Sequence, residues 1–79
     1  MITIGIDPHK QTNTAVAASE LGRQLAEITV PANEAGQQEL LAWAHGIGTE
    51  IRFALEDCRH VNGRLERFLV ASGEPVLRG

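Results

Sequence analysis

The sequence has little of several features that would assign it to a class of protein. Its 79 residues include a single cysteine, Cys58, so no disulfide can form within the chain, and this fits the reducing cytoplasm. No apolar run approaches the ~20 residues that cross a bilayer. The first residues lack the basic and apolar segments of a secretory signal. We therefore expect a cytoplasmic protein with no membrane partner.

The chain is also short, acidic and free of repeats. Its hydrophobic fraction of 43% and charged fraction of 22% are those of one small globular domain, and its formal net charge is −3. Nucleic-acid backbones are bound mainly through Lys and Arg. An acidic chain is therefore expected to bind nucleic acid only if divalent cations neutralise its carboxylates or if the basic surface lies in a part of the protein outside this chain. The spacing of the histidines and the cysteine does not match a zinc site.

The first part of the chain is predicted to form an antiparallel meander. In residues 2–7 isoleucine recurs at every second position, a period of two that predicts a strand ending at Asp7 and Pro8. A short turn leads to a second strand over 12–19, and a Gly-containing connection leads to a third over 23–30. Connections this short join antiparallel neighbours.

A helix is predicted next. Pro31 breaks the third strand, Asn33 is suited to cap the helix, and Glu34 favours the positive end of its dipole. Gly46 and Gly48 are expected to close it. The apolar residues recur at the spacing of one helix face, which comprises Leu40, Trp43, Ala44 and Ile47.

A fourth strand, a second helix and the start of a fifth strand complete the chain. Residues 51–55 are apolar at alternate positions, Glu56 ends that strand, and Asp57 is expected to cap the helix. Gly73 ends the helix and residues 74–77 enter the last strand. The helix is marked by the apolar residues Val61, Leu65, Phe68 and Leu69.

The predicted order is therefore β-β-β-α-β-α-β, an α/β fold. A three-stranded antiparallel meander is followed by parallel strands with crossover helices. If the fourth strand returns beside the first, Asp7 and Glu56 end at the same sheet edge on strands ~4.8 Å apart. Sites in open α/β sheets lie outside the carboxyl ends of the strands.

Asp7 and Glu56 are accordingly the candidate catalytic and metal-binding residues. Taken singly, Asp7 is equally a residue that stabilises a turn, and Glu56 equally a surface carboxylate. Together they suit Mg²⁺ or Mn²⁺, which takes one or two carboxylates with water and substrate phosphate. A two-metal site would need further carboxylates.

His9 and Lys10 follow directly and are candidate substrate contacts. His9 could orient a phosphate or a water, and Lys10 could meet a phosphate as a point charge. Both are equally residues of an exposed turn. His45 is expected to act only through the dipole of its helix, and Cys58 to be buried and structural.

The order of these motifs carries a resemblance to a known family. Residues 4–10 read Ile-Gly-Ile-Asp-Pro-His-Lys, and residues 12–17 read Thr-Asn-Thr-Ala-Val-Ala. A strand ending at residues 30–31 in Val-Pro and a strand reading Phe-Ala-Leu-Glu at 53–56 follow. Over essentially its whole length the chain resembles the N-terminal domain of the DEDD transposases of the insertion sequence 110 family.

This resemblance implies a fold like that of the RuvC Holliday-junction resolvases, in the ribonuclease-H-like superfamily. Residues 1–79 would be the N-terminal part of one nuclease domain, truncated before the rest of that domain and a C-terminal domain with a serine for strand exchange. It implies four acidic metal ligands, the first Asp7 and the Glu of the set Glu56, with two Asp further along. It also implies Mg²⁺ or Mn²⁺ as cofactor, with DNA and a structured guide RNA as partners. The piece alone is then expected to be inactive.

The sequence departs from the family at 57–63, where many members have a Gly-rich run, so no substrate contact is assigned there. Two alternative classes stay open. An actin-like ATPase or sugar kinase also opens with a strand ending in Asp, but its phosphate loop needs glycines, and the turn at 8–11 has none. A non-catalytic assembly module is the other, because open sheet edges invite a homo-oligomer.

Overall fold

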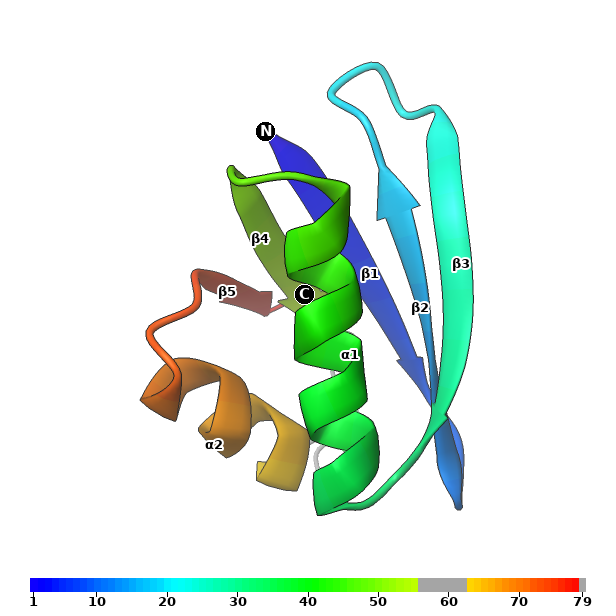
Figure 1. The fold of residues 1–79 in the computed structure, drawn as a ribbon, viewed down its shortest axis with the longest axis vertical. Helices are drawn as coiled ribbons and strands as arrows, with labels where there is room; N and C mark the ends of the chain where they lie inside the picture. The colour runs from blue at the N-terminus through cyan, green and yellow to red at the C-terminus, as the bar shows by residue number, and fades with distance from the viewer. Residues whose placement is uncertain (56–62, 79) are drawn as a thin grey trace.

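The computed structural model describes residues 1–55 and 63–78 (Figure 1). Within these residues no helix is long and apolar enough to cross a membrane. In chain order the elements are β1 (Ile2–Pro8), β2 (Thr12–Ala18), β3 (Gln24–Pro31), α1 (Glu34–Ile47), β4 (Ile51–Leu55), α2 (Gly63–Ala71) and β5 (Val76–Arg78).

The strands form one mixed, five-stranded sheet in the order β3-β2-β1-β4-β5. β2 runs antiparallel to both of its neighbours, whereas β4 is parallel to β1 and β5 is parallel to β4. The strand order stated from the sequence is an order along the chain, and it differs from the order across the sheet. The reason is that α1 carries the chain from β3, at one edge, back past β2 to the far side of β1 (Figure 1).

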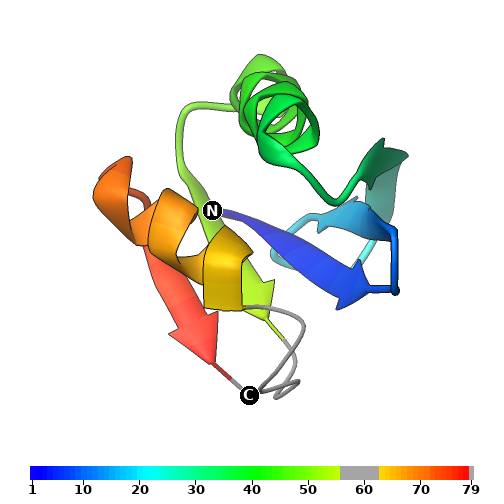
Figure 2. The ribbon, with the colours of Figure 1, turned by 90° about the horizontal axis from the view of Figure 1, so that it is seen from below.

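Both described helices lie on one face of the sheet (Figures 1 and 2). Successive strand residues point to opposite faces, so every second residue of β1, β2 and β4 packs under the helices. The buried apolar core comprises Ile4, Ile6, Ala15, Ala17, Val30, Leu40, Ala44, Ile51, Phe53, Leu55, Leu65 and Leu69. The opposite face carries no described helix, and we call it the open face.

The strands end slightly differently from the predicted bounds. β1 includes Pro8 and β3 includes Pro31, each as its last residue. Proline lacks an N–H but is tolerated at the end of a strand, and Pro31 also lies on an edge strand. Gly46 was expected to close α1, which is wrong, since the helix continues through Ile47 and only Gly48 forms the cap.

The start of α1 is fixed closely to the end of β3. Asn33 caps the helix as predicted, with its side-chain oxygen accepting from the amide of Gly36 at 2.8 Å. Gly36 is buried, and a Cβ at this position would lie 1.8 Å from the carbonyl oxygen of Pro31. The predicted apolar face packs inward, with Leu40 and Ala44 buried. Trp43 and Ile47 are partly buried against the core.

Gly73 ends the second helix, as the sequence predicted. It adopts φ 80, a conformation that favours glycine. Its amide donates to the carbonyl of Val70, and the next amide, of Glu74, donates to that of Leu69, both at 3.0 Å. These two bonds satisfy carbonyls that the helix end would leave free and direct the chain into β5.

Candidate functional site

The predicted site residues lie at the carboxyl end of β1. Asp7 follows the buried Ile6 and therefore points to the open face, away from both helices. Its side chain is 63% exposed. Asp7 belongs to β1, which has a paired strand on each side. Asp7 itself pairs with Thr14 of β2, and the preceding residue, Ile6, pairs with Leu55 of β4. The carboxylate is thus accessible but carried on rigid backbone.

A tight hairpin follows the strand. The amide of His9 donates to the carbonyl of Thr12 at 2.8 Å, and Lys10 and Gln11 form the exposed tip. Gln11 in turn accepts from the amide of Ala32 at 2.9 Å, which ties the tip to the start of α1. One bond therefore closes the hairpin, and the other braces its tip.

The structure brings His9 near Asp7. Its Nε2 lies 3.6 Å from Oδ2 of Asp7, and its side chain is 52% exposed. This separation is too long for a hydrogen bond, and the pair is an ion pair only when the imidazole is protonated. Both groups therefore keep most of their polar surface open to solvent. Lys10 is also exposed, at the hairpin tip.

Several other predicted residues cannot be placed. Glu56 follows Leu55 in the sequence and lies outside the described residues, as do Asp57 and Cys58. The parallel register of β1 and β4 is described as far as the pair Ile6 and Leu55. The two strands therefore lie side by side and run in the same direction as far as Ile6 and Leu55, the residues that precede Asp7 and Glu56.

Asp7 is the exposed carboxylate at the carboxyl end of β1 that could bind a metal ion. Within residues 1–55 and 63–78 there is no group of three or more His, Cys, Asp or Glu that could hold one. The oxygens of Asp7 suit a hard cation such as Mg²⁺, which binds through one or two carboxylates and keeps several waters. Among the described residues at this end of β1, Asp7 could therefore serve as one ligand of such an ion.

Thr14 was not singled out from the sequence, although it lies directly beside Asp7. The two are Cα partners, and the Thr14 hydroxyl is 3.0 Å from that of Thr29 on β3. Counting back from a hairpin that closes between His9 and Thr12 gives this pairing, so the turn position was the usable signal. The hydroxyl pair borders the carboxylate on the open face.

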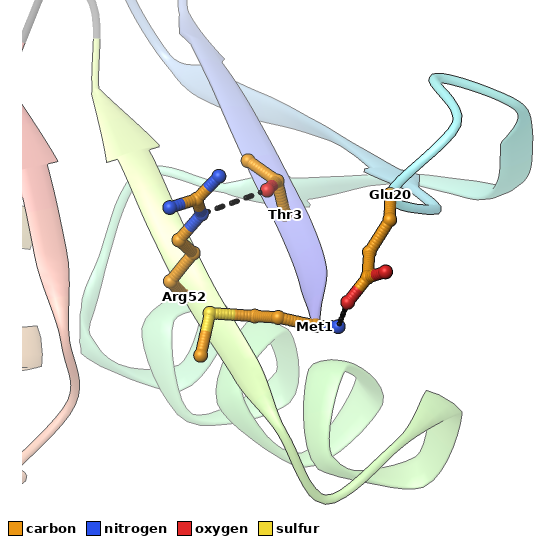
Figure 3. Close-up of polar contacts among 4 residues, drawn as sticks. All are labelled: Met1, Thr3, Glu20 and Arg52. Atoms are coloured by element: carbon orange, nitrogen blue, oxygen red, sulfur yellow. Dashed lines mark hydrogen bonds and ion pairs between the residues drawn. The ribbon is translucent and has the colours of Figure 1, made fainter.

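The amino end of β1 also gathers polar groups, which Figure 3 shows. The amine of Met1 pairs with the carboxylate of Glu20, and Arg52 Nε donates to Thr3 Oγ1 at 3.0 Å. A hydrogen bond from the amine, and then its positive charge, lower the pKa of Glu20. These contacts join the turn after β2 to β1, and β1 to β4.

His45 does more than the sequence predicted. Besides lying in the last turn of α1, its Nε2 is 3.0 Å from Oε2 of Glu74, whose side chain is only 11% exposed. The expectation of a dipole effect alone is therefore wrong. Glu74 comes from the distant connection between α2 and β5, so no local pattern could have indicated the pair.

Comparison with protein-family models and with curated proteins finds no match to this chain. Its function is therefore inferred from the residues at the carboxyl end of β1 and from the resemblance that its sequence carries.

Proposed function

We propose that this chain is the N-terminal part of a ribonuclease-H-like, metal-dependent DNA transposase or recombinase, with Asp7 as its first metal-binding carboxylate. The arrangement of elements supports this. An antiparallel meander is followed by parallel strands joined through helices. This is the arrangement expected from the family resemblance. Asp7, the penultimate residue of β1, has an exposed side chain on that scaffold.

The observation that carries the proposal is the parallel register of β1 and β4. Ile6 of β1 is paired with Leu55 of β4, and each precedes a predicted ligand in the sequence. Carboxylates that follow paired residues of adjacent parallel strands start from backbones ~4.8 Å apart, within reach of one ion. We therefore assign Asp7 and Glu56 as a ligand pair for Mg²⁺ or Mn²⁺.

A divalent ion held at such a site would supply an activated water and stabilise charge on phosphate oxygens. The chain's own residues would position the ion and the DNA. Asp7 binds through oxygens that no described hydrogen bond occupies. His9 and Lys10 stand on the braced hairpin next to it and can contact a phosphate of DNA or of a guide RNA. Because the ion would neutralise the charge of these carboxylates, the net negative charge of the chain is compatible with a nucleic-acid substrate.

The actin-like ATPase alternative is less well supported by the first hairpin. Phosphate loops of that kind bind through free backbone amides near the strand end. Here the amide of His9 is donated to Thr12, and Pro8 has no amide hydrogen to offer. A kinase would be established instead if a longer form of the protein bound ATP and had no activity on DNA.

Metal binding can be tested on the 79-residue chain itself. Substoichiometric Mn²⁺ should broaden the amide NMR signals of Asp7, His9 and Thr14 selectively, with weak affinity because the ligand set is incomplete. Asp7→Asn should abolish the selective broadening, whereas Glu27→Gln, on β3 and separated from β1 by β2, should leave it unchanged. Broadening spread evenly over all surface carboxylates would contradict the assignment.

Catalysis has to be tested on a longer protein that includes this chain. Asp7→Ala and Glu56→Ala should each abolish metal-dependent DNA cleavage or strand transfer while the protein stays folded, as judged by circular dichroism. Glu39→Ala, an exposed carboxylate on α1, is the matched control and should retain activity. Activity in either Asp7→Ala or Glu56→Ala would rule out the proposal.

A further inference from the structure

The outer edge of β3 is the longest open edge of the sheet. β3 spans eight residues and stands at one end of the strand order, so no described strand pairs with its outer side. The other edge strand, β5, has three residues. An unpaired edge presents a row of amide and carbonyl groups that can bind another strand.

The hydrogen bonds between β2 and β3 identify which backbone groups of β3 face outward. The amide of Ala32 donates to the carbonyl of Gln11 at 2.9 Å, in step with the pairing of Asn13 with Val30. In an antiparallel ladder every second residue bonds to the partner strand. Val30 and Ile28 therefore bond to β2, and the backbone groups of the intervening residues, Glu27 and Thr29, point away from the sheet.

We propose that β3 pairs antiparallel with β3 of a second copy of this chain, about a two-fold axis at Ile28. Glu27 would then bond to Thr29 of the partner subunit, and Thr29 to the partner's Glu27. An antiparallel edge is complementary to itself under a two-fold rotation, so one contact satisfies both copies. The other edge strand, β5, offers only three residues to such a contact.

Charge and packing select this register. Centring the axis on Glu27 would place two carboxylates directly opposite each other, which is destabilising. Centring it on Ile28 instead places each Glu27 opposite a neutral threonine. It also joins Ile28 to the partner's Ile28 at a closely spaced pair, covering apolar surface that is only partly buried in one copy.

The fold leaves room for this contact. α1 lies over the middle of the sheet, and β3 forms the flank of the molecule, with no helix of the described residues beyond it (Figures 1 and 2). Asp7 is on β1, separated from this edge by β2. The pairing therefore neither uses nor blocks the proposed metal site, and it stands whether or not the chain is a nuclease.

Sedimentation equilibrium of the 79-residue chain tests the proposal with two variants at one position. Thr29→Lys places an ammonium opposite each partner carboxylate and should lower the dimer dissociation constant roughly five-fold. Thr29→Glu places like charges together and should raise it by a similar factor. Both variants lose the same hydroxyl contact with Thr14, so that loss cancels in the comparison.

Each other outcome overturns the proposal. A wild-type chain that remains monomeric at about 1 mM has no such contact. Equal dissociation constants for the two folded variants would place any dimer interface elsewhere. Weakening by both variants would indicate a register with Thr29 opposite itself. Circular dichroism and the urea midpoint of each variant at low concentration establish that the monomer is folded in every case.

Discussion

Charged groups lie at both ends of β1, but the contacts that they make differ. At the amino end the charges are engaged: the Met1 amine is paired with Glu20, and Arg52 donates to Thr3 at 3.0 Å. At the carboxyl end Asp7 and His9 stand 3.6 Å apart with side chains 63% and 52% exposed. The first group joins strands and turns to one another, whereas the second leaves its polar atoms available to a ligand.

Two glycines of α1, one near each end of β1, differ in how closely they approach the rest of the chain. At the carboxyl end the hairpin tip is bonded to Ala32, and Gly36 packs onto the Pro31 carbonyl. At the amino end the last turn of α1 is open around Gly46, where an added Cβ would meet nothing within 4 Å. Rigid backbone beneath accessible side chains is the arrangement that a binding site requires, because it fixes geometry without occupying the ligand atoms.

The largest effect should come from Gly36→Ala. In most helices alanine is favoured over glycine by about 1 kcal/mol. Here the new methyl group would overlap the Pro31 carbonyl at 1.8 Å, and a backbone atom cannot simply rotate away. We expect a loss of roughly 3 kcal/mol in the free energy of unfolding, measured by urea denaturation.

Gly46→Ala is the matched control at the other end of the same helix. It gains helix propensity without a steric contact, so the free energy of unfolding should rise by up to about 1 kcal/mol. A destabilised Gly46→Ala, or a neutral Gly36→Ala, would show that the two ends of α1 do not differ as the structure indicates.

Removing the helix cap should have an intermediate effect at the carboxyl end. Asn33→Ala deletes the acceptor for the Gly36 amide and should lower the free energy of unfolding by about 1 kcal/mol. Hydrogen exchange should become faster in the first turn of α1 and stay unchanged in its last turn. Uniform acceleration along the helix would instead mean that the cap stabilises the whole helix and not this end.

Local patterns predicted most of the fold, and tertiary contacts account for what they missed. Alternation in β1 and the periodicity of Leu40 and Ala44 correctly indicated which residues are buried. The approach of Gly36 to Pro31 and the pair of His45 with Glu74 depend on how separate elements dock, which no sequence window records. The structure has the mixed α/β architecture that was predicted, and the ribonuclease-H-like assignment is a proposal.

The predictions about the candidate site also divide into those that depend on local patterns and those that depend on tertiary contacts. The strand pattern and Pro8 placed Asp7 at a strand end, because a period of two and a proline act locally. Its proximity to His9 also follows from short separation in the sequence. Its pairing with Thr14 required the position of the hairpin, and its relation to Glu56 involves a residue outside the described part of the chain.

Neutralising Asp7 should affect stability little, which would sharpen the contrast between the ends. The pair with His9 is exposed and 3.6 Å long, and such pairs contribute little. Asp7→Asn should therefore change the free energy of unfolding by no more than about 0.5 kcal/mol. A larger loss in urea denaturation at neutral pH would mean that this carboxylate is structural, like the polar groups at the amino end.

The smallest effect should be a pH-dependent contribution of Glu20 at the amino end. The Met1 amine holds the pKa of Glu20 below its usual value in the folded chain, so folding favours the ionised carboxylate. That contribution is present above the pKa of the unfolded chain and is lost as pH falls through the lower, folded value. Thermal unfolding of Glu20→Gln should therefore begin at slightly lower temperature than wild type at pH 7.

The difference between Glu20→Gln and wild type should shrink as pH falls through the lowered pKa of Glu20 and vanish once the carboxylate is protonated in both the folded and the unfolded chain. Glu39→Gln removes an exposed carboxylate from α1 and controls for the change in net charge. If the difference persists at acid pH, the glutamate acts through packing and not through its charge. The amino end would then no longer be held by ionic contacts, and the accessibility of Asp7 alone would distinguish the two ends.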